Sequence, residues 1–493
     1  RSSSTRPCEE VFSTRAEDEH LLCSLCERGH IQKALSLLSS METSPSNSTY
    51  LCFLKTCNRK KDLLSAKQVY HHITGTKNGT DLSGFLGDYL VVTLSRCGDV
   101  EEAVHVSHSL ARRTVFSWTA IISAYVDCGH AHKALQMYGL MLDEGIDPDS
   151  HTFVSLLKVC GSIQDLKLGK KLHSEAKEKG FLSDVFVGNS LITMYGRCGR
   201  VSDAEDVFLS MPSRDIISWN AMLLAFVDQC QGEKGLRLYR QMLEESKEPD
   251  SRTLMSILQA LGGHIADMEK PMEKASDKDR EFLNERDLEI GQALHAYAKR
   301  KGLLYDVFVG NALVSMYGKC GAIKEAESLL VASTRQDVVS WTSLISGYAK
   351  YESGESALEC FERMKLKGVT PNAVTYVCSL TACGRVGETS KGEEIHAQME
   401  SVETDIVVGN SLINMYAKFG MFGKANNVFD KLSVRNVVSW TALVTGYAQH
   451  GYCQQALNDI ERMQVEGMNP DAVTFVCCIK SCTNLGNIVQ GLE

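Results

Sequence analysis

The strongest constraint on this fold is a segment of sixteen residues that occurs three times in the chain. DVFVGNSLITMYGRCG at 184–199 returns as DVFVGNALVSMYGKCG at 306–321 and, more loosely, as DIVVGNSLINMYAKFG at 405–420. The four tryptophans, each preceded by a serine, lie 101, 122 and 99 residues apart. A sequence made of internal copies folds by stacking small units instead of enclosing one large core. We therefore expect a repeat protein that grows as one elongated body.

Each period contains three shorter repeats, at 115–149, 150–184 and 185–215. The first repeat carries apolar residues at the i, i+3, i+4, i+7 spacing that lines one face of a helix, namely Trp118, Ile121, Ile122 and Tyr125. Gly129 follows, and glycine readily takes the left-handed conformation that ends a helix. A second apolar helical series then completes a hairpin. Because one hairpin cannot bury both of its faces, the pattern predicts an all-α fold, an α-solenoid of stacked helix-turn-helix repeats.

Composition excludes several classes of protein. No apolar run approaches the roughly 20 residues that span a bilayer. The net charge of −9 argues against a generally basic nucleic-acid coat. The 18 cysteines are spread over 493 residues without a paired framework, so we expect reduced thiols and not a disulfide scaffold. We expect no cofactor and no small-molecule substrate.

Repeats of 35, 35 and 31 residues that carry SW(N/T)A, VGN(S/A)L and MYG(R/K)CG resemble the P, L and S motifs of plant pentatricopeptide repeat (PPR) proteins of the PLS subfamily. The resemblance extends from about residue 15 to residue 493 and implies a right-handed α-solenoid superhelix. The alternative is a tetratricopeptide-like protein-interaction scaffold without RNA specificity, whose fixed 34-residue period does not fit the 31-residue repeats.

The resemblance also implies the following division of the chain: 1–14 N-terminal tail, 15–46 partial P-like, 47–83 L-like, 84–114 S-like, 115–149 P, 150–184 L, 185–215 S, 216–250 P, 251–306 L with a charged insertion at about 263–286, 307–337 S, 338–372 P, 373–405 L, 406–436 S, 437–471 P and 472–493 truncated L. The insertion is rich in Lys, Asp and Glu, and we expect a solvated loop there.

Polar residues occupy two places in the P and S repeats. The fifth residue is Asn or Thr, at Thr119, Asn189, Asn220, Asn311, Thr342, Asn410 and Thr441. The last residue is Asp or Asn, at Asp149, Asp215, Asp250, Asp337, Asn372, Asn436 and Asp471. One interpretation is local, because Asp and Asn cap helices. The other follows from the resemblance, which implies that each fifth and last residue together recognise one RNA base.

Carried over repeat by repeat, Thr with Asp implies G, Asn with Asp implies U, Thr with Asn implies A, and Asn with Asn implies C. The predicted RNA is G-n-U-U-n-U-A-n-C-G, since the L repeats carry Val154, Met255 and Val377 at the fifth place. Asp88 with Thr114 stays unassigned. The second residues would sandwich the bases or belong to the core: Phe116, Phe186, Ile217, Phe308, Val339, Val407 and Val438.

Other motifs predict no chemistry. His173, His295 and His396 fall in different periods, so we expect packing histidines and no metal site. His173-Ser174-Glu175 matches half of a zinc deaminase signature whose PCxxC half is missing from the chain. We therefore expect no enzyme in this chain, which we interpret as a fragment that lacks the C-terminal extension and cytidine deaminase domains of its family. The resemblance implies single-stranded organellar RNA and RNA-editing proteins as partners, a mitochondrial or chloroplast location, no membrane, and a role in RNA editing or processing.

Overall fold

The structure, a computed structural model, describes residues 8–41, 44–75, 85–110, 112–268, 277–333, 335–351, 353–399 and 405–485. These residues form 27 α-helices and two short 3-10 helices, and they contain no β-strand. None of the described helices is long and apolar enough to cross a lipid bilayer. The chain divides into two bodies, residues 1–229 and 230–493. The prediction of an all-α fold is confirmed.

The N-terminal body contains α1 (Cys8–Glu27), α2 (Ile31–Ser40), α3 (Asn47–Lys60), α4 (Leu63–Gly75), α5 (Phe85–Arg96), α6 (Val100–Ser109), α7 (Val115–Asp127), α8 (Ala131–Asp143), α9 (Ser150–Ile163), α10 (Leu166–Glu178), η1 (Phe181–Ser183), α11 (Val185–Arg197), α12 (Val201–Ser210) and α13 (Ile216–Asp228).

The C-terminal body contains α14 (Gly232–Glu244), α15 (Ser251–Met268), α16 (Asp277–Arg300), η2 (Leu303–Tyr305), α17 (Val307–Lys319), α18 (Ile323–Ala332), α19 (Val338–Tyr351), α20 (Gly354–Leu366), α21 (Ala373–Val386), α22 (Thr389–Ala397), α23 (Ile406–Lys418), α24 (Phe422–Lys431), α25 (Val437–Gln449), α26 (Cys453–Val465) and α27 (Ala472–Leu485).

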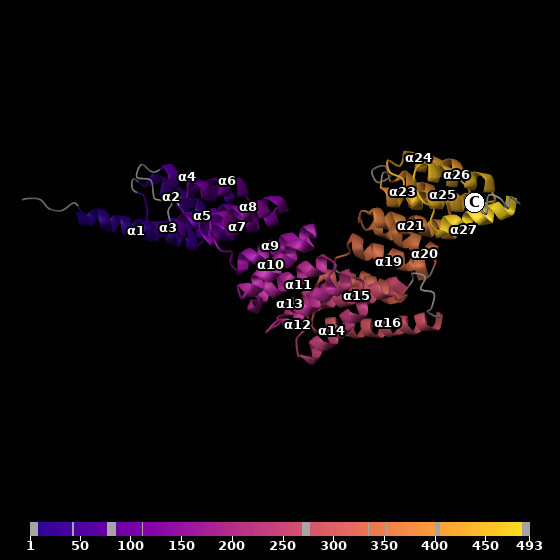
Figure 1. The fold of residues 1–493 in the computed structure, drawn as a ribbon, viewed down its shortest axis with the longest axis horizontal. Coiled ribbons are helices and arrows are strands. Elements are labelled where there is room, and N and C mark those ends of the chain that lie inside the picture. Colours follow the sequence, from indigo (N-terminus) through magenta and orange to yellow (C-terminus); the bar gives the residue numbers. More distant parts are fainter. Residues whose placement is uncertain are drawn as a thin grey trace, which may run out of the picture. The chain divides into compact units, whose positions relative to one another are not determined.

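Within each body the first helices of successive hairpins lie side by side (Figure 1). In the N-terminal body α5, α7, α9, α11 and α13 pack in that order, and in the C-terminal body α15, α17, α19, α21, α23, α25 and α27 do the same. Within each body, the second helix of a hairpin packs against the first helix of the same hairpin, as α8 does against α7 and α20 against α19, and so adds a second layer. This is the solenoid arrangement that the repeats predict.

Buried apolar stripes hold the layers together, as the hairpin at α7 and α8 illustrates. Trp118 and Ile122 of α7 are buried, as is Met141 of α8. Gly129 between the two helices has a φ of +76°, which a residue with a side chain rarely adopts. All four tryptophans are at most 2% exposed. The Ser-Trp pairs therefore mark helices that are anchored in the core.

The charged insertion differs from the loop that its composition predicts. Residues 263–268 belong to α15 and residues 277–286 belong to α16, so the described part of the insertion is helical, and 269–276 lie outside the described residues. Glu, Lys, Ala and Met are good helix formers, so a helix can continue without an apolar stripe once one end is packed. Leu294 and Ala298 anchor α16 in this way, since both are buried. Helix α1 begins at Cys8, within the N-terminal tail expected at 1–14.

Candidate nucleic-acid interface

The last residue of each P and S repeat stands at the start of the next helix, where its side chain accepts a hydrogen bond from the backbone N–H three residues later. The N···O distances are 2.8 to 3.0 Å for Asp149, Asp215, Asp250, Asp337, Asn372, Asn436 and Asp471. Such caps satisfy a helix N–H that would otherwise lack a partner. These residues therefore cap helices, as the local interpretation predicts, and the capping bonds fix the position of each side chain.

In the S repeats the fifth residue bonds directly to this capping residue. The Asn189 amide donates to Asp215 over 3.2 Å, and the Asn311 amide donates to Asp337 over 2.7 Å. The Asn410 amide donates to the side-chain oxygen of Asn436 over 3.2 Å. Residues 26 positions apart thus form one polar pair at the seam between two hairpins. The structure brings together the residues that the sequence pairs.

In the P repeats the fifth residue is linked to the capping residue by the hydroxyl of another threonine, which lies between them. The Thr119 oxygen lies 2.6 Å from the Thr152 oxygen, and Thr152 donates to Asp149 over 2.7 Å. The same chain of contacts links Thr342 to Asn372 and Thr441 to Asp471. One pair stays a prediction, because Asn220 lies in the N-terminal body and Asp250 in the C-terminal body.

Hydrogen bonding lowers the pKa of three capping carboxyls, those of Asp215, Asp337 and Asp471. Burial raises the pKa of the Asp215 carboxyl, but bonds from the N–H and hydroxyl of Ser218 and from Asn189 lower it by more, so the pKa lies below its usual value. The pKa values of Asp337 and Asp471 are lowered by the same balance of burial and hydrogen bonds. These side chains therefore act as anionic acceptors at neutral pH.

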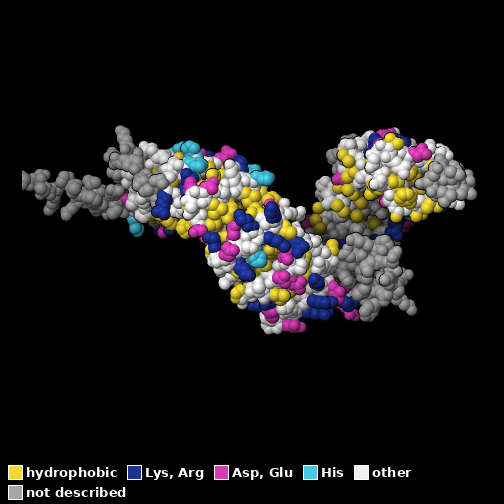
Figure 2. Space-filling view, viewed as in Figure 1, with side chains coloured by type: hydrophobic (Ala, Val, Ile, Leu, Met, Phe, Trp, Pro, Cys, Tyr) yellow, Lys and Arg dark blue, Asp and Glu magenta, His cyan; other side chains and the backbone are white. Residues whose placement is uncertain are grey.

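The second residues of these repeats are exposed, which contradicts their assignment to the core. Apolar side chains reach the surface of both bodies in Figure 2. The second residues are between 49% and 69% exposed, and they are Phe116, Phe186, Ile217, Phe308, Val339, Val407 and Val438. Each of them precedes its fifth residue by three positions, one helical turn away, so the exposed apolar side chain and the polar pair lie near each other. A regular row of exposed apolar side chains is typical of a binding surface.

One pair that the sequence left unassigned has the same geometry. The Thr114 hydroxyl donates to Oδ2 of Asp88 over 2.8 Å, while Oδ1 of Asp88 is buried and has no hydrogen-bond partner. Asp88 lines a cavity of about 1040 Å³, together with the exposed Phe85 and Phe116. The sequence could have predicted this contact, because Asp88 and Thr114 are the fifth and last residues of the repeat at 84–114.

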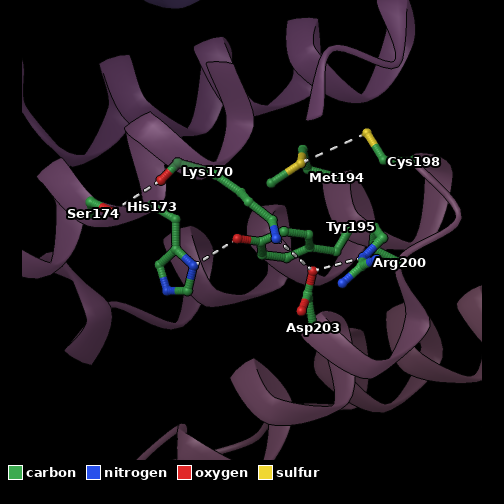
Figure 3. Close-up of polar contacts among 8 residues, drawn as sticks. All are labelled: Lys170, His173, Ser174, Met194, Tyr195, Cys198, Arg200 and Asp203. Carbon is green, nitrogen blue, oxygen red and sulfur yellow. Dashed lines mark hydrogen bonds and ion pairs between the residues drawn. The ribbon is translucent and has the colours of Figure 1, made fainter. Parts of the chain in front are cut away.

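The three recurring histidines are packing residues. The Nδ1 atom of His173 on α10 lies 2.9 Å from the hydroxyl of Tyr195 on α11 (Figure 3). His295 and His396 contact Tyr317 and Tyr416 in the same way, at 3.0 and 2.7 Å. Among the residues that the structure describes, no group of three or more His, Cys, Asp or Glu side chains is arranged to hold a metal ion.

Comparison with known families assigns the repeats. Residues 113–162, 336–385 and 435–484 match the PPR repeat family, and residues 20–45, 189–216, 217–246, 311–332 and 410–437 match the PPR repeat. A chloroplastic pentatricopeptide repeat-containing protein of Arabidopsis thaliana is 31% identical over 98% of this chain and 54% of its own length. A second chloroplastic relative is 32% identical over 88% of this chain and 67% of its own length. A mitochondrial relative is 28% identical, with 92% of this chain and 50% of its own length covered. The chain thus spans about half to two thirds of the length of these relatives.

Solved structures share the fold. The crystal structure of the pentatricopeptide repeat protein PPR10 from maize superposes with a TM-score of 0.58 at 19% identity, covering 96% of this chain and 72% of that chain. PPR10 in complex with an 18-nucleotide psaJ RNA element superposes with a TM-score of 0.52 at 18% identity, covering 96% of this chain and 82% of that chain.

Proposed function

Because the chain belongs to the pentatricopeptide repeat family, we propose that it is a sequence-specific single-stranded RNA-binding protein in which one base faces each repeat. The observation that carries this proposal is the pairing of fifth and last residues at the seams, as in Asn189 with Asp215 and Asn311 with Asp337. A base edge needs such fixed donors and acceptors to be told from other bases. The RNA complex of PPR10 supports the ligand class.

The exposed second residues supply the faces against which bases stack. Phe116, Phe186 and Phe308 are each more than 60% exposed, although large aromatic side chains ordinarily gain free energy by burial. A base that stacks on such a ring covers it, and stacking contributes about 1–3 kcal/mol per base. This sequence-tolerant term provides affinity, and the polar pairs provide selectivity.

The preferred RNA is G-n-U-U-n-U-A-n-C-G, where n faces an L repeat. An L repeat offers no polar fifth side chain, since the residues there are Val154, Met255 and Val377. Elsewhere, a carboxylate can only accept hydrogen bonds, whereas an amide both donates and accepts, so Asp and Asn at the last place favour different base edges. The repeat with Asp88 and Thr114 adds a further polar pair at the N-terminal end of this register.

We assign the protein to the PLS subfamily and to an organelle, with editing or processing of an organellar transcript as its role. The recurring lengths of 35, 35 and 31 residues support the subfamily, and the names of the chloroplastic and mitochondrial relatives support the location. RNA-editing proteins are the expected protein partners. Any catalytic step belongs to those partners or to a further domain, because the polar pairs described here bind and do not react.

Selection of RNA from a random single-stranded pool tests the proposal. The purified chain should enrich the predicted register, with U at its sixth position opposite Asn311 and A at its seventh opposite Thr342. Binding without enrichment of any register would reject base recognition, and an absence of RNA binding would favour a tetratricopeptide-like protein scaffold.

A further inference from the structure

A buried hydroxyl accompanies every polar seam between repeats. At seven seams that follow a P or S repeat, the third residue of the next repeat is a Ser or Thr that is at most 2% exposed: Thr152, Ser218, Thr253, Ser340, Thr375, Ser439 and Thr474. Each hydroxyl donates to the side-chain oxygen of the last residue, over 2.7 to 3.1 Å. Together with the backbone cap, this bond holds the last residue in one rotamer.

In four seams the same hydroxyl also contacts the fifth residue. The oxygens of Thr342 and Thr375 are 2.7 Å apart, and the two equivalent Thr pairs are 2.6 and 2.8 Å apart. The Ser439 hydroxyl lies 2.6 Å from the side-chain oxygen of Asn410 and 3.0 Å from that of Asn436, so these two acceptors share its one hydrogen. The third residue therefore touches both side chains that the proposed function assigns to the base.

Counting hydrogens shows how the hydroxyls of Thr342 and Thr375 are ordered. A hydroxyl has one hydrogen, and that of Thr375 is donated to the side-chain oxygen of Asn372 over 2.8 Å. At the contact between Thr342 and Thr375, Thr342 must then be the donor. The oxygen of Thr342 is left with lone pairs only, so it presents an acceptor to any further partner. The buried Thr375 side chain thus determines whether the fifth residue, Thr342, offers a donor or an acceptor to a further partner.

The L repeats provide an internal comparison. Their fifth residues are apolar, and the third residue of the repeat that follows is a valine that is fully buried: Val187, Val309 and Val408. The capping residues before these valines bond instead to the backbone N–H of the second residue, as Asp184 does to Phe186 over 2.8 Å. The polar fifth residue and the third hydroxyl are present together or replaced together within this one chain.

We propose that the third-residue hydroxyl is a positioning residue for base recognition, which orders the fifth and last side chains before RNA binds. The inference rests on the proposed RNA-binding function. An ordered pair avoids the entropy loss of fixing two side chains on binding and presents one pattern of donors and acceptors. Without the hydroxyl, the fifth-residue Thr can rotate and act either as donor or as acceptor, so discrimination between bases falls.

Thr375→Val tests the proposal with a side chain of nearly the same shape. The backbone cap remains, because the N–H of residue 375 still bonds to Asn372 over 2.9 Å. We expect the preference for A at the seventh base to fall by about 5- to 30-fold, the usual effect of losing a buried hydrogen bond, while preferences at the other bases stay. Thr375→Ser should restore the preference. Thr381→Val removes an exposed hydroxyl from the same helix α21 and should change nothing.

The possible outcomes distinguish failure of the positioning role from failure of the proposed RNA-binding function. A folded Thr375→Val variant that keeps the wild-type preference for A overturns the positioning role, whereas a wild-type chain without preference at any base overturns the proposed function instead. A merely structural role would lower the melting temperature and leave the ratio between bases unchanged. Should Thr375→Val fail to fold, Ser439→Ala provides the same test at the ninth base, where loss of the preference for C is expected and an unchanged preference contradicts the proposal.

Discussion

The side-chain nitrogen of Asn311 on α17 lies 2.7 Å from Oδ2 of Asp337 at the start of α19. Oδ1 of the same carboxylate accepts bonds from the N–H groups of Val339 and Ser340 over 3.1 and 3.0 Å. One oxygen therefore caps a helix and the other holds the amide of the neighbouring repeat. Helix capping and the proposed base recognition, which the sequence presents as alternatives, are therefore compatible at this one carboxylate.

Phe186→Ala should weaken RNA binding without unfolding the protein. The ring is 64% exposed, so its removal costs little packing, while the lost stacking corresponds to about 5- to 150-fold in the dissociation constant. Leu209→Ala on α12 is the matched control, since it removes a side chain that is 58% exposed outside the row. Fluorescence anisotropy with the predicted RNA measures both variants. Equal RNA affinities of the two variants would show that the Phe186 ring does not contribute to RNA binding.

Binding should depend only modestly on salt, because the chain carries a net charge of −9 and base edges supply much of the recognition. Each phosphate contact adds about −0.7 to the slope of log K against log salt concentration for a single strand. Filter binding across a salt series gives this slope. A steep slope combined with an absence of base preference would indicate nonspecific polyanion binding.

Acid should destabilise the fold through its histidine-tyrosine pairs. Burial lowers the pKa of His173, as does Lys177 nearby, while Asp203 acts in the opposite direction. Burial also lowers the pKa of His295 and raises that of Tyr195 to about 12. The histidines are therefore neutral in the fold and take up protons on unfolding, so stability is lost as the pH falls through the unfolded value of about 6.5.

The measurement is the melting temperature between about pH 7.5 and about pH 5.5, a window set by the ordinary pKa of histidine. The double variant His173→Gln and His295→Gln should show a shallower loss of stability with acid than the wild type. The lowered carboxyl pKa values, as at Asp215, act in the same direction but only below about pH 4. Identical pH profiles for the variant and the wild type would show that these pairs do not titrate on unfolding.

Two glycine substitutions should change stability in opposite directions. A methyl group at Gly446 on α25 would collide with Ala417 on α23, so Gly446→Ala forces neighbouring repeats apart and should cost about 1–3 kcal/mol. A methyl group at Gly139 on α8 would meet no atom within 4 Å, so Gly139→Ala should stabilise its helix by about 0.5–1 kcal/mol. Thermal melts of both variants check the stacking geometry. A Gly446→Ala protein as stable as the wild type would refute the close contact of α23 and α25.

The helical hairpins and the polar pairs could be predicted because both depend on local spacing. Trp118 and Ile122 lie one turn apart on one face, and Asn189 and Asp215 stand at fixed places in a repeat. The structure adds the partners that spacing cannot reveal. Thr375 precedes a buried tyrosine in a helix and resembles a common capping residue, so nothing in the sequence alone links its hydroxyl to Thr342, 33 residues away.

Exposure and the insertion were harder to predict for physical reasons. Valine is common both in cores and on binding surfaces, so the sequence left Val339 and Val407 open between the two, and the structure places both at the surface. Charged residues such as those at 277–286 are frequent in loops and also in solvated helices. Only the packing of Leu294 farther along α16 decides between these states.

The most direct test of the central claim is the base preference of Asn311→Thr. The change converts an Asn–Asp pair into a Thr–Asp pair, so the sixth base of the register should shift from U toward G while the preferences at all other bases stay. Equilibrium binding to four RNAs that differ only at this base, measured for the variant and for the wild type, gives the answer. Reversal of the order of U and G in the variant is the predicted result, and the same order in both proteins would contradict recognition of one base by Asn311 and Asp337.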